Sequence, residues 1–107
     1  MNNDLINKLL KFRDERDWEK FHTPENLAKS ISIESAELLE LFQWSSQANI
    51  EELKDEMADI YIYLLLLANN LNIDLNVIAD KKIEKNNQKY PISKSKGNSK
   101  KYTKFSK

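Results

Sequence analysis

Apolar side chains recur every three or four residues along most of the chain, and this period predicts helices. The pattern divides into four segments, at residues 3–18, 24–44, 50–68 and 75–88. No stretch alternates apolar and polar positions in the way that a half-buried strand does. We therefore expect an all-α fold that resembles a four-helix bundle.

Several residues mark where these helices begin and end. Thr23 followed by Pro24 is the usual order of an N-cap and a proline in the first helical turn. Asn49 and Asp74 are also side chains that commonly cap helices, and they precede the third and fourth segments. We expect the second helix to end near Trp44, before a short polar loop.

The third segment is apolar on nearly every side between residues 60 and 67. A helix of this kind must be covered from several directions, and a chain of 107 residues has few other helices to provide that cover. We therefore expect the protein to be oligomeric.

Two acidic pairs lie on the second and third segments. Glu34 and Glu37 are three residues apart, and so are Glu56 and Asp59. Residues at this spacing share one face of a helix, so each pair can direct two carboxylates toward one point. Two such helices packed together would gather four carboxylates, whose repulsion and desolvation a hard divalent cation would relieve.

The position of Glu34 within its helix supports burial of this site. The apolar stripe of the second segment includes Leu27, Leu38 and Leu41, and Glu34 lies in the middle of that stripe, whereas Glu40 falls on the polar face. An ordinary apolar core would not keep an unpaired carboxylate. Because Mg²⁺ prefers oxygen ligands, we predict that the two acidic pairs bind Mg²⁺, with Mn²⁺ as an alternative.

The composition excludes several classes of function. The chain has no cysteine and one glycine, so it offers neither a thiolate metal site nor a glycine-rich phosphate loop. Its longest apolar run, residues 60–68, is too short to cross a membrane, and no signal peptide opens the chain. We expect a cytoplasmic protein without a membrane partner.

The formal net charge of zero conceals an uneven distribution. Residues 1–84 carry 9 basic and 17 acidic residues, a formal charge of −8, whereas eight lysines and no acidic residue follow. We divide the chain into a helical domain at residues 1–91 and a basic tail at residues 92–107. The tail is either solvated, bound to a partner, or folded back toward polyanions held by the acidic body.

Other side chains indicate a phosphorylated substrate that carries a base. Lys82 interrupts the apolar stripe of the fourth segment, where a lysine can pair with a carboxylate, bind a phosphate or extend to the surface. Trp18, Trp44 and Tyr63 offer flat surfaces on which a base can stack, although each is also a good core residue. His22, the only histidine, either has a structural role or faces a ligand. Mg²⁺ commonly keeps substrate phosphates in its coordination shell, which agrees with such a substrate.

The two acidic pairs belong to longer runs with 18 residues between Glu37 and Glu56, namely Glu34-Ser-Ala-Glu37-Leu-Leu-Glu40-Leu-Phe-Gln-Trp44 and Glu56-Met-Ala-Asp59-Ile-Tyr-Ile-Tyr63. In these runs the chain resembles the MazG-like all-α nucleoside triphosphate pyrophosphohydrolases, and most closely their dCTP pyrophosphatase branch. The likeness extends to residues 15–18, 21–27, 86–91 and 101–103, so it covers most of the chain.

This resemblance implies a reaction and a set of site residues. Members of the family hydrolyse a nucleoside triphosphate between its α- and β-phosphates and release the monophosphate and pyrophosphate. The family typically assembles as a tetramer, a dimer of dimers. Carried over residue by residue, the resemblance implies that Mg²⁺ is held by Glu34, Glu37, Glu56 and Asp59, that the nucleoside pocket is lined by Trp18, Phe21, His22, Trp44 and Tyr63, and that the polyphosphate lies near Lys82 and Asn86.

Two departures from the branch concern the choice of base. The vertebrate dCTP enzymes carry a histidine where this chain has Leu9, and their loop between the acidic helices is longer than residues 45–50. We expect a dCTP-like substrate, with the same reaction on another or a modified deoxynucleotide as the alternative. A different class of function remains as a further alternative, namely a non-catalytic helical adaptor or a nucleic-acid binder that uses the basic tail.

Overall fold

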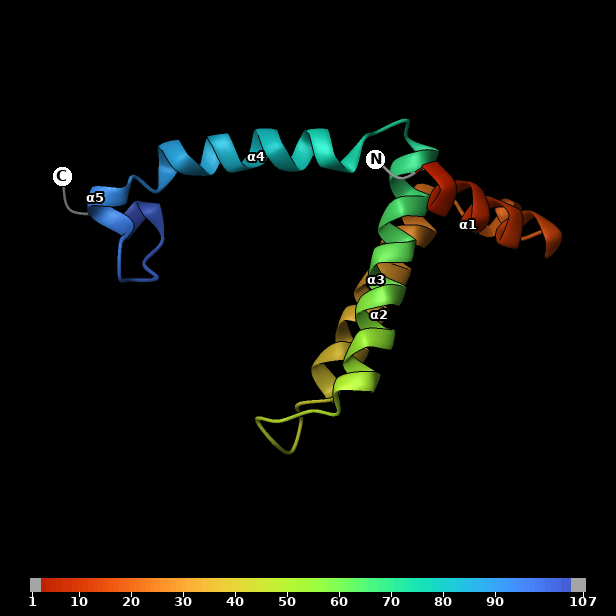
Figure 1. Cartoon of the computed structure of the whole chain (residues 1–107), viewed down its shortest axis with the longest axis horizontal. Helices are drawn as coiled ribbons and strands as arrows, with labels where there is room; N and C mark the ends of the chain where they lie inside the picture. Colours follow the sequence, from red (N-terminus) through yellow and green to blue (C-terminus); the bar gives the residue numbers. More distant parts are fainter. Residues whose placement is uncertain (1–2, 105–107) are drawn as a thin grey trace. The chain divides into compact units, whose positions relative to one another are not determined.

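The structure, a computed structural model, describes residues 3–104 of the chain. No strand is present within these residues, which confirms the predicted all-α class. The elements, drawn in Figure 1, are α1 (Asn3–Glu15), the 3₁₀ turn η1 (Glu19–Phe21), α2 (Pro24–Glu40), α3 (Ile50–Asn70), α4 (Leu75–Lys89), α5 (Ile92–Ser95) and the 3₁₀ turn η2 (Tyr102–Lys104).

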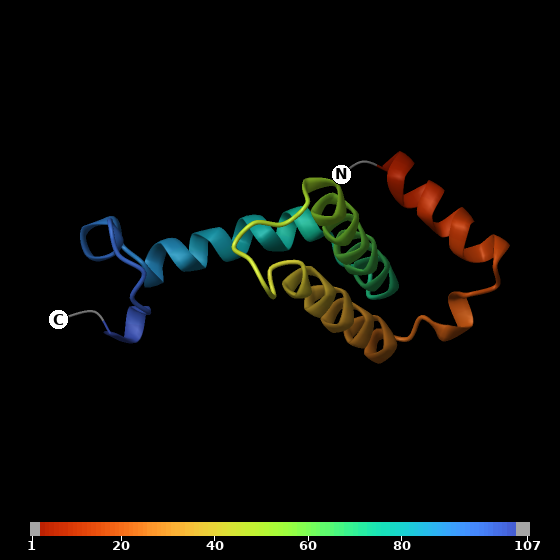
Figure 2. The same cartoon turned by 90° about the horizontal axis from the view of Figure 1, so that it is seen from below.

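The chain divides into two compact units, one that ends at Asp74 and one that begins at Leu75. The first unit holds α1, η1, α2 and α3, and the second holds α4, α5 and η2. Within the first unit α2 and α3 lie side by side and make the main helix contact, while α1 makes fewer contacts with α3 (Figures 1 and 2). The four-helix bundle, the oligomer and the boundary between residues 91 and 92 stay predictions.

The predicted N-caps of α2 and α3 are confirmed. The Thr23 hydroxyl accepts a hydrogen bond of 3.2 Å from the backbone N–H of Asn26, and proline occupies the first turn of α2. The Asn49 side-chain oxygen accepts hydrogen bonds from the backbone N–H groups of Glu51 and Glu52, at 2.9 and 3.1 Å. These caps satisfy free N–H groups at the starts of the two helices that carry the acidic pairs.

Helix α1 ends at Glu15, three residues before the predicted end at Trp18. Asp17 takes a left-handed backbone conformation, with φ of 55°. The Trp18 N–H donates to the Arg13 carbonyl and the Asp17 N–H donates to the Asp14 carbonyl, each at 3.1 Å. This is the Schellman arrangement that closes a helix, here with aspartate at the position where glycine is more usual.

Helix α2 ends at Glu40 rather than near Trp44. The next three backbone N–H groups, those of Leu41, Phe42 and Gln43, donate to carbonyls three residues earlier, which is tighter than the α-helical spacing. The Trp44 side chain is 90% exposed, so no packing contact holds a further helical turn in place.

Few apolar side chains of the described residues are fully buried. Those below the surface are Leu27 of α2 and Leu65, Leu66 and Ala68 of α3. Large apolar side chains of the same two helices remain more than two-fifths exposed, among them Ile33, Leu39, Met57 and Tyr61. A single copy of the chain therefore leaves much of the apolar surface of α2 and α3 in water.

Helix α4 begins directly after Asp74, as predicted, and ends at Lys89, one residue beyond the predicted end. Its expected inner stripe includes Ile78 and Ile83, which are both about half exposed. In the described residues no single helix is long and apolar enough to span a membrane. Only α3 and α4 taken together, with the break between them, reach the required length and apolar composition.

Candidate metal centre

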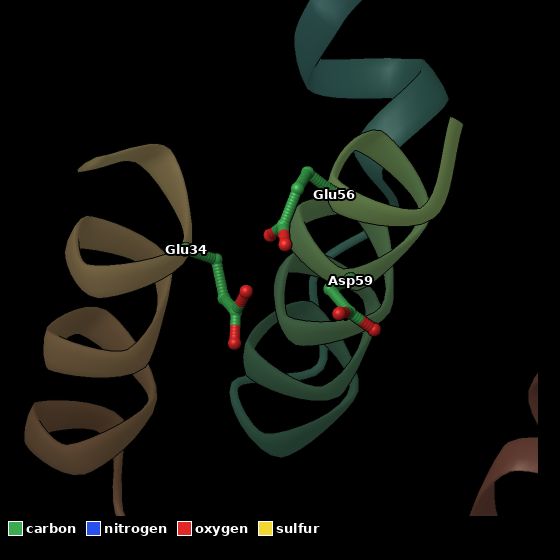
Figure 3. A group of neighbouring side chains, drawn as sticks. All are labelled: Glu34, Glu56 and Asp59. Carbon is green, nitrogen blue, oxygen red and sulfur yellow. The ribbon is translucent and has the colours of Figure 1, made fainter. Parts of the chain in front are cut away.

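Helices α2 and α3 bring three of the four predicted carboxylates together. Glu34 comes from α2, and Glu56 and Asp59 come from adjacent turns of α3. One carboxylate oxygen from each residue lies within 4.8 Å of the others. Figure 3 shows Glu34 reaching from α2 toward α3, where Glu56 faces it. We call these three residues the acidic cluster.

The acidic cluster can hold a divalent cation. Glu34 is half-buried in the stripe that begins at the buried Leu27, as its position in the sequence predicts. One oxygen of Glu34 and one oxygen of Glu56 are buried without a hydrogen-bond partner among the described residues. Buried carboxylate oxygens without a donor are costly, and a cation would remove that cost. The donors are all carboxylate oxygens, which suit Mg²⁺, Mn²⁺ or Ca²⁺ rather than a metal that prefers sulfur or nitrogen.

The carboxyl groups strongly affect one another's protonation. Burial, followed by hydrogen bonds to the carboxyls of Glu56 and Glu37 and then by the charges of Glu37 and Asp59, raises the pKa of Glu34 to about 7. Burial is also the main cause that raises the pKa of Glu56, and the Glu34 hydrogen bond opposes that rise. Without a cation, the cluster therefore retains a proton near neutral pH.

The fourth predicted carboxylate, Glu37, is exposed and lies outside the group of three. It is one turn from Glu34 on α2, and its charge contributes to the raised pKa values of Glu34 and Glu56. Glu40 is exposed, as expected for the polar face. Glu37 is thus close enough to add to the negative field of the cluster.

A cavity of about 490 Å³ lies between α1 and α3 and adjoins the acidic cluster, because Asp59 belongs to both. Its walls are mostly apolar and aromatic. They are formed by Leu5, Lys8, Leu9, Phe12 and Arg13 of α1, by Trp18 and His22 from the connection after α1, and by Asp59, Ile62, Tyr63 and Leu66 of α3. We call it the α1–α3 cavity, and it contains three of the predicted substrate residues, Trp18, His22 and Tyr63.

Local contacts hold Trp18 in the cavity wall. Its ring meets the ring of Phe12 edge-on, with 5.7 Å between centroids. The Arg16 guanidinium lies 3.8 Å above the centre of the Phe12 ring and donates a hydrogen bond of 2.9 Å to the Phe12 carbonyl. These contacts keep two aromatic rings in fixed relation at one end of α1.

His22 is held beside the C-terminal end of α3. Its backbone carbonyl accepts a hydrogen bond of 3.1 Å from the Asn70 side-chain amide. The Nδ1 atom of His22 is buried and has no hydrogen-bond partner in the described part of the chain. Burial, together with the charge of Arg13, lowers the pKa of His22, so the imidazole is neutral at pH 7.

The remaining predicted substrate residues do not line this cavity. Phe21 is more than half exposed, and Trp44 lies in the exposed turn after α2. Lys82 and Asn86 belong to α4 in the second unit, where Lys82 is exposed and Asn86 is half-buried. Their roles stay predictions.

Sequence reasoning missed two charged residues of the cavity wall, Lys8 and Arg13. The signal was present, because Leu5, Leu9 and Arg13 follow one another at intervals of four and so share a face of α1. A long cation such as Arg13 can belong to an apolar face, because its hydrocarbon stem packs on apolar surface.

Fold and site together define an all-helical protein with a candidate divalent-metal centre between two helices and a cavity with aromatic walls beside it. A model of the MazG-like family matches residues 29–105. This match covers most of the chain, including both acidic pairs, and the chain belongs to the MazG-like family.

Similar proteins carry names that agree with this family. The chain is 40% identical over 102 residues to dCTP pyrophosphatase 1 of Rattus norvegicus and 37% identical over 102 residues to that of Homo sapiens, with 86% of this chain covered in each case. It spans 60% of the length of these relatives. The crystal structure of a pyrophosphatase from Archaeoglobus fulgidus has a TM-score of 0.77 and 46% identity, over 83% of this chain and 91% of that one.

Proposed function

We propose that this protein hydrolyses a deoxynucleoside triphosphate between the α- and β-phosphates and releases the monophosphate and pyrophosphate. The observation that carries the proposal is the acidic cluster beside the α1–α3 cavity, because carboxylates that can hold a metal ion lie next to a surface suited to a base. The names of the similar proteins, dCTP pyrophosphatase and pyrophosphatase, support the same reaction.

Glu34, Glu56 and Asp59 would hold the metal, with Glu37 beside them as a further ligand or a source of negative charge. We propose Mg²⁺, with Mn²⁺ as a substitute, because every donor is a carboxylate oxygen. The bound cation would supply positive charge to the polyphosphate and lower the pKa of a nearby water.

The hydrolytic step forms one bond and breaks one bond. A water oxygen attacks the α-phosphorus, and the bond between that phosphorus and the oxygen bridging to the β-phosphorus breaks, so pyrophosphate leaves with the bridging oxygen. The proton of the water passes to a carboxylate of the acidic cluster. Lys82 is proposed to neutralise charge on the departing pyrophosphate, with Asn86 as a neighbouring polar contact.

The nucleoside would occupy the α1–α3 cavity, against Trp18, His22 and Tyr63. Phe21 and Trp44 stay part of the proposed substrate site on the strength of the family resemblance. A dCTP-like substrate is the first candidate, because two of the similar proteins are named for dCTP. Leu9 lines the cavity, so the residue in which this chain departs from the vertebrate enzymes lies where it can affect the choice of base.

An oligomer would complete the fold. Exposed apolar side chains on α2 and α3 favour contact with further copies of the chain. We propose a homotetramer, built as a dimer of dimers.

The test is to incubate the purified protein with each canonical and several modified nucleoside triphosphates and Mg²⁺, and to resolve the nucleotide and phosphate products. The proposal predicts monophosphate and pyrophosphate in equal amounts from one class of base, and loss of turnover when EDTA removes the metal. No turnover of any nucleotide with either Mg²⁺ or Mn²⁺ would refute it.

A further inference from the structure

The α1–α3 cavity contains a cation that the proposed reaction does not use. Arg13 lies in the last turn of α1, and its side chain is only 15% exposed. An arginine side chain carries five N–H donors in a planar, rigid group and has no acceptor. Arg13 therefore brings a concentrated set of donors to a mainly apolar wall.

Contacts within the chain hold one edge of the Arg13 guanidinium. Its Nε donates to Asp14 Oδ1 at 2.8 Å, and Nη2 lies 2.7 Å from the same oxygen. The contact of Nη2 with Glu19 is longer, at 3.6 Å. Asp14 thus binds the side edge of the group. Among the described residues, the end edge, formed by Nη1 and the second N–H of Nη2, has only the 3.6 Å ion pair with the exposed Glu19. The Asp14 pair orients the guanidinium, and a ligand in the cavity that Arg13 lines would compete only with the long, exposed Glu19 contact for the two parallel donors of the end edge.

Arg13 lies toward the end of the cavity that is remote from the metal centre. Asp59 marks the metal end, and His22, bonded to Asn70, marks the other. Asn70 lies eleven positions after Asp59 on α3, a rise of about 16 Å. Arg13 Nη2 lies 3.6 Å from the Glu19 carboxylate, and the Glu19 backbone carbonyl accepts a hydrogen bond of 3.0 Å from the His22 N–H, so Arg13 belongs to the His22 end. A nucleotide with its phosphates at the acidic cluster would therefore present its base, not its phosphates, to Arg13.

We infer that Arg13 is a specificity-determining residue that donates hydrogen bonds to the edge of the base. The preferred base then has two adjacent acceptors on that edge, as cytosine and guanine do. This inference rests on the proposed nucleotide chemistry. Two parallel N–H donors match O6 and N7 of guanine, or N3 and O2 of cytosine. Uracil and thymine have an N–H donor between their carbonyls, and adenine has an amino donor beside N1 and N7, so these bases offer no such pair.

The surroundings of Arg13 favour discrimination between bases that present two acceptors and bases that present an N–H donor. The cavity walls are mostly apolar, so a base whose N–H faced the guanidinium would bury two donors against each other without an acceptor. His22 is neutral at pH 7 and has a buried, unpartnered Nδ1 in the same wall. That atom can pair with a remaining polar group of the bound base without adding charge.

Substitution of Arg13 tests the inference through the ratio of kcat/KM values between bases. Arg13→Gln and Arg13→Lys are assayed with the cytosine, guanine, uracil, thymine and adenine deoxynucleoside triphosphates. We expect kcat/KM for the preferred base to fall about 10- to 100-fold and the values for the other bases to change by less than about threefold. Lysine keeps the ion pair with Asp14 but cannot present two parallel donors, so it tests the donor geometry without removing the charge.

A matched control and a binding assay separate base reading from a structural role. Lys11→Gln removes a cation from an exposed position of the same helix, outside the cavity, and should leave the ratios unchanged. Tryptophan fluorescence titrations with the deoxynucleoside monophosphates should show the same base preference as turnover. Arg13→Gln should abolish that preference, with a melting temperature close to that of Lys11→Gln.

Two results would overturn the inference. One is a wild-type preference for uracil, thymine or adenine. The other is an equal loss of kcat/KM for all bases in Arg13→Gln, which would assign Arg13 to the phosphates or to the fold. Failure of the proposed function looks different, because then no nucleotide yields monophosphate and pyrophosphate in the wild type.

Discussion

Glu34 occupies a position where a helix normally buries a hydrocarbon side chain. It follows Leu27 at helical spacing on the inner face of α2, yet its carboxylate faces Glu56 on α3 (Figure 3). Each carboxylate oxygen left there without a donor weakens the fold unless a cation is bound. The residue therefore indicates function through its position as much as through its chemistry.

Glu34→Gln should abolish metal-dependent turnover and leave the helical fold intact, because it removes charge while it keeps volume. Loss of a ligand should lower the affinity for Mg²⁺ by about 100-fold or more, because removal of a group that only supports a ligand already costs about 10- to 100-fold. Calorimetric titration with Mg²⁺, an activity assay and circular dichroism measure the three quantities. Glu40→Gln, an exposed position of the same helix, is the control and should behave as wild type. Retained activity in Glu34→Gln would show that the metal site is elsewhere.

The stability of the metal-free protein should fall as the pH rises through the neutral range. The folded state raises the pKa of Glu34 from its ordinary value of 4.5 to about 7. Between these values the folded protein holds a proton that the unfolded chain has released, so the free energy of unfolding decreases from about pH 4.5 to about pH 7 and is then constant with respect to this group. Urea unfolding in EDTA at pH 5, 6, 7 and 8 measures this change in the free energy of unfolding.

His22 contributes in the opposite sense over the same pH range, because its lowered pKa makes the fold more stable as the pH rises toward 6.5. Comparison with Glu34→Gln isolates the contribution of Glu34, since the variant keeps His22. The difference in unfolding free energy between wild type and Glu34→Gln should move in favour of the variant as the pH rises. A difference that does not change with pH would contradict the shifted pKa.

At the scale of the helices, the caps were predictable and two of the helix ends were not. Thr23 and Asn49 cap α2 and α3 because their side chains accept backbone N–H groups that lie only two or three residues away. The end of α1 depends on a left-handed aspartate, Asp17, for which the sequence carries no glycine signal. The end of α2 depends on the lack of packing around Trp44, which is a tertiary property.

Thr23→Ala should destabilise the protein by about 1 kcal/mol, because it removes the acceptor of the Asn26 N–H at the start of α2. Urea denaturation followed by circular dichroism measures the change. Ser46→Ala, in the exposed loop before α3, is the control and should shift the free energy of unfolding by less than about 0.5 kcal/mol. Equal effects of the two substitutions would show that the cap does not stabilise α2.

At the scale of the molecule, spacing along single helices predicted the acidic cluster better than it predicted the cavity. Glu34, Glu56 and Asp59 meet because α2 and α3 pack on the faces that the sequence pattern marks. The α1–α3 cavity depends instead on how α1 and the connection after it return toward α3, which a periodic pattern does not encode. For that reason the sequence did not predict Arg13 as a cavity residue, and the structure shows it in the cavity wall.

The exposed apolar surface makes a prediction about the assembly. Sedimentation equilibrium should give a mass four times the 12.6 kDa of one chain. Leu39→Glu, which places a charge on an apolar residue that is 71% exposed on α2, should shift the protein to smaller species. Lys11→Glu, at an exposed polar position of α1, should not change the mass. A wild-type mass of a single chain would contradict the proposed assembly.

The proposed chemistry is tested most directly by hydrolysis of the preferred nucleotide in ¹⁸O-labelled water, followed by ³¹P NMR. This one measurement identifies the products and the phosphorus atom that water attacks. We predict monophosphate and pyrophosphate, with the label on the monophosphate, because the acidic cluster lies beside the α1–α3 cavity proposed to hold the nucleoside. Nucleoside diphosphate with labelled orthophosphate, or pyrophosphate that carries the label, would contradict the account.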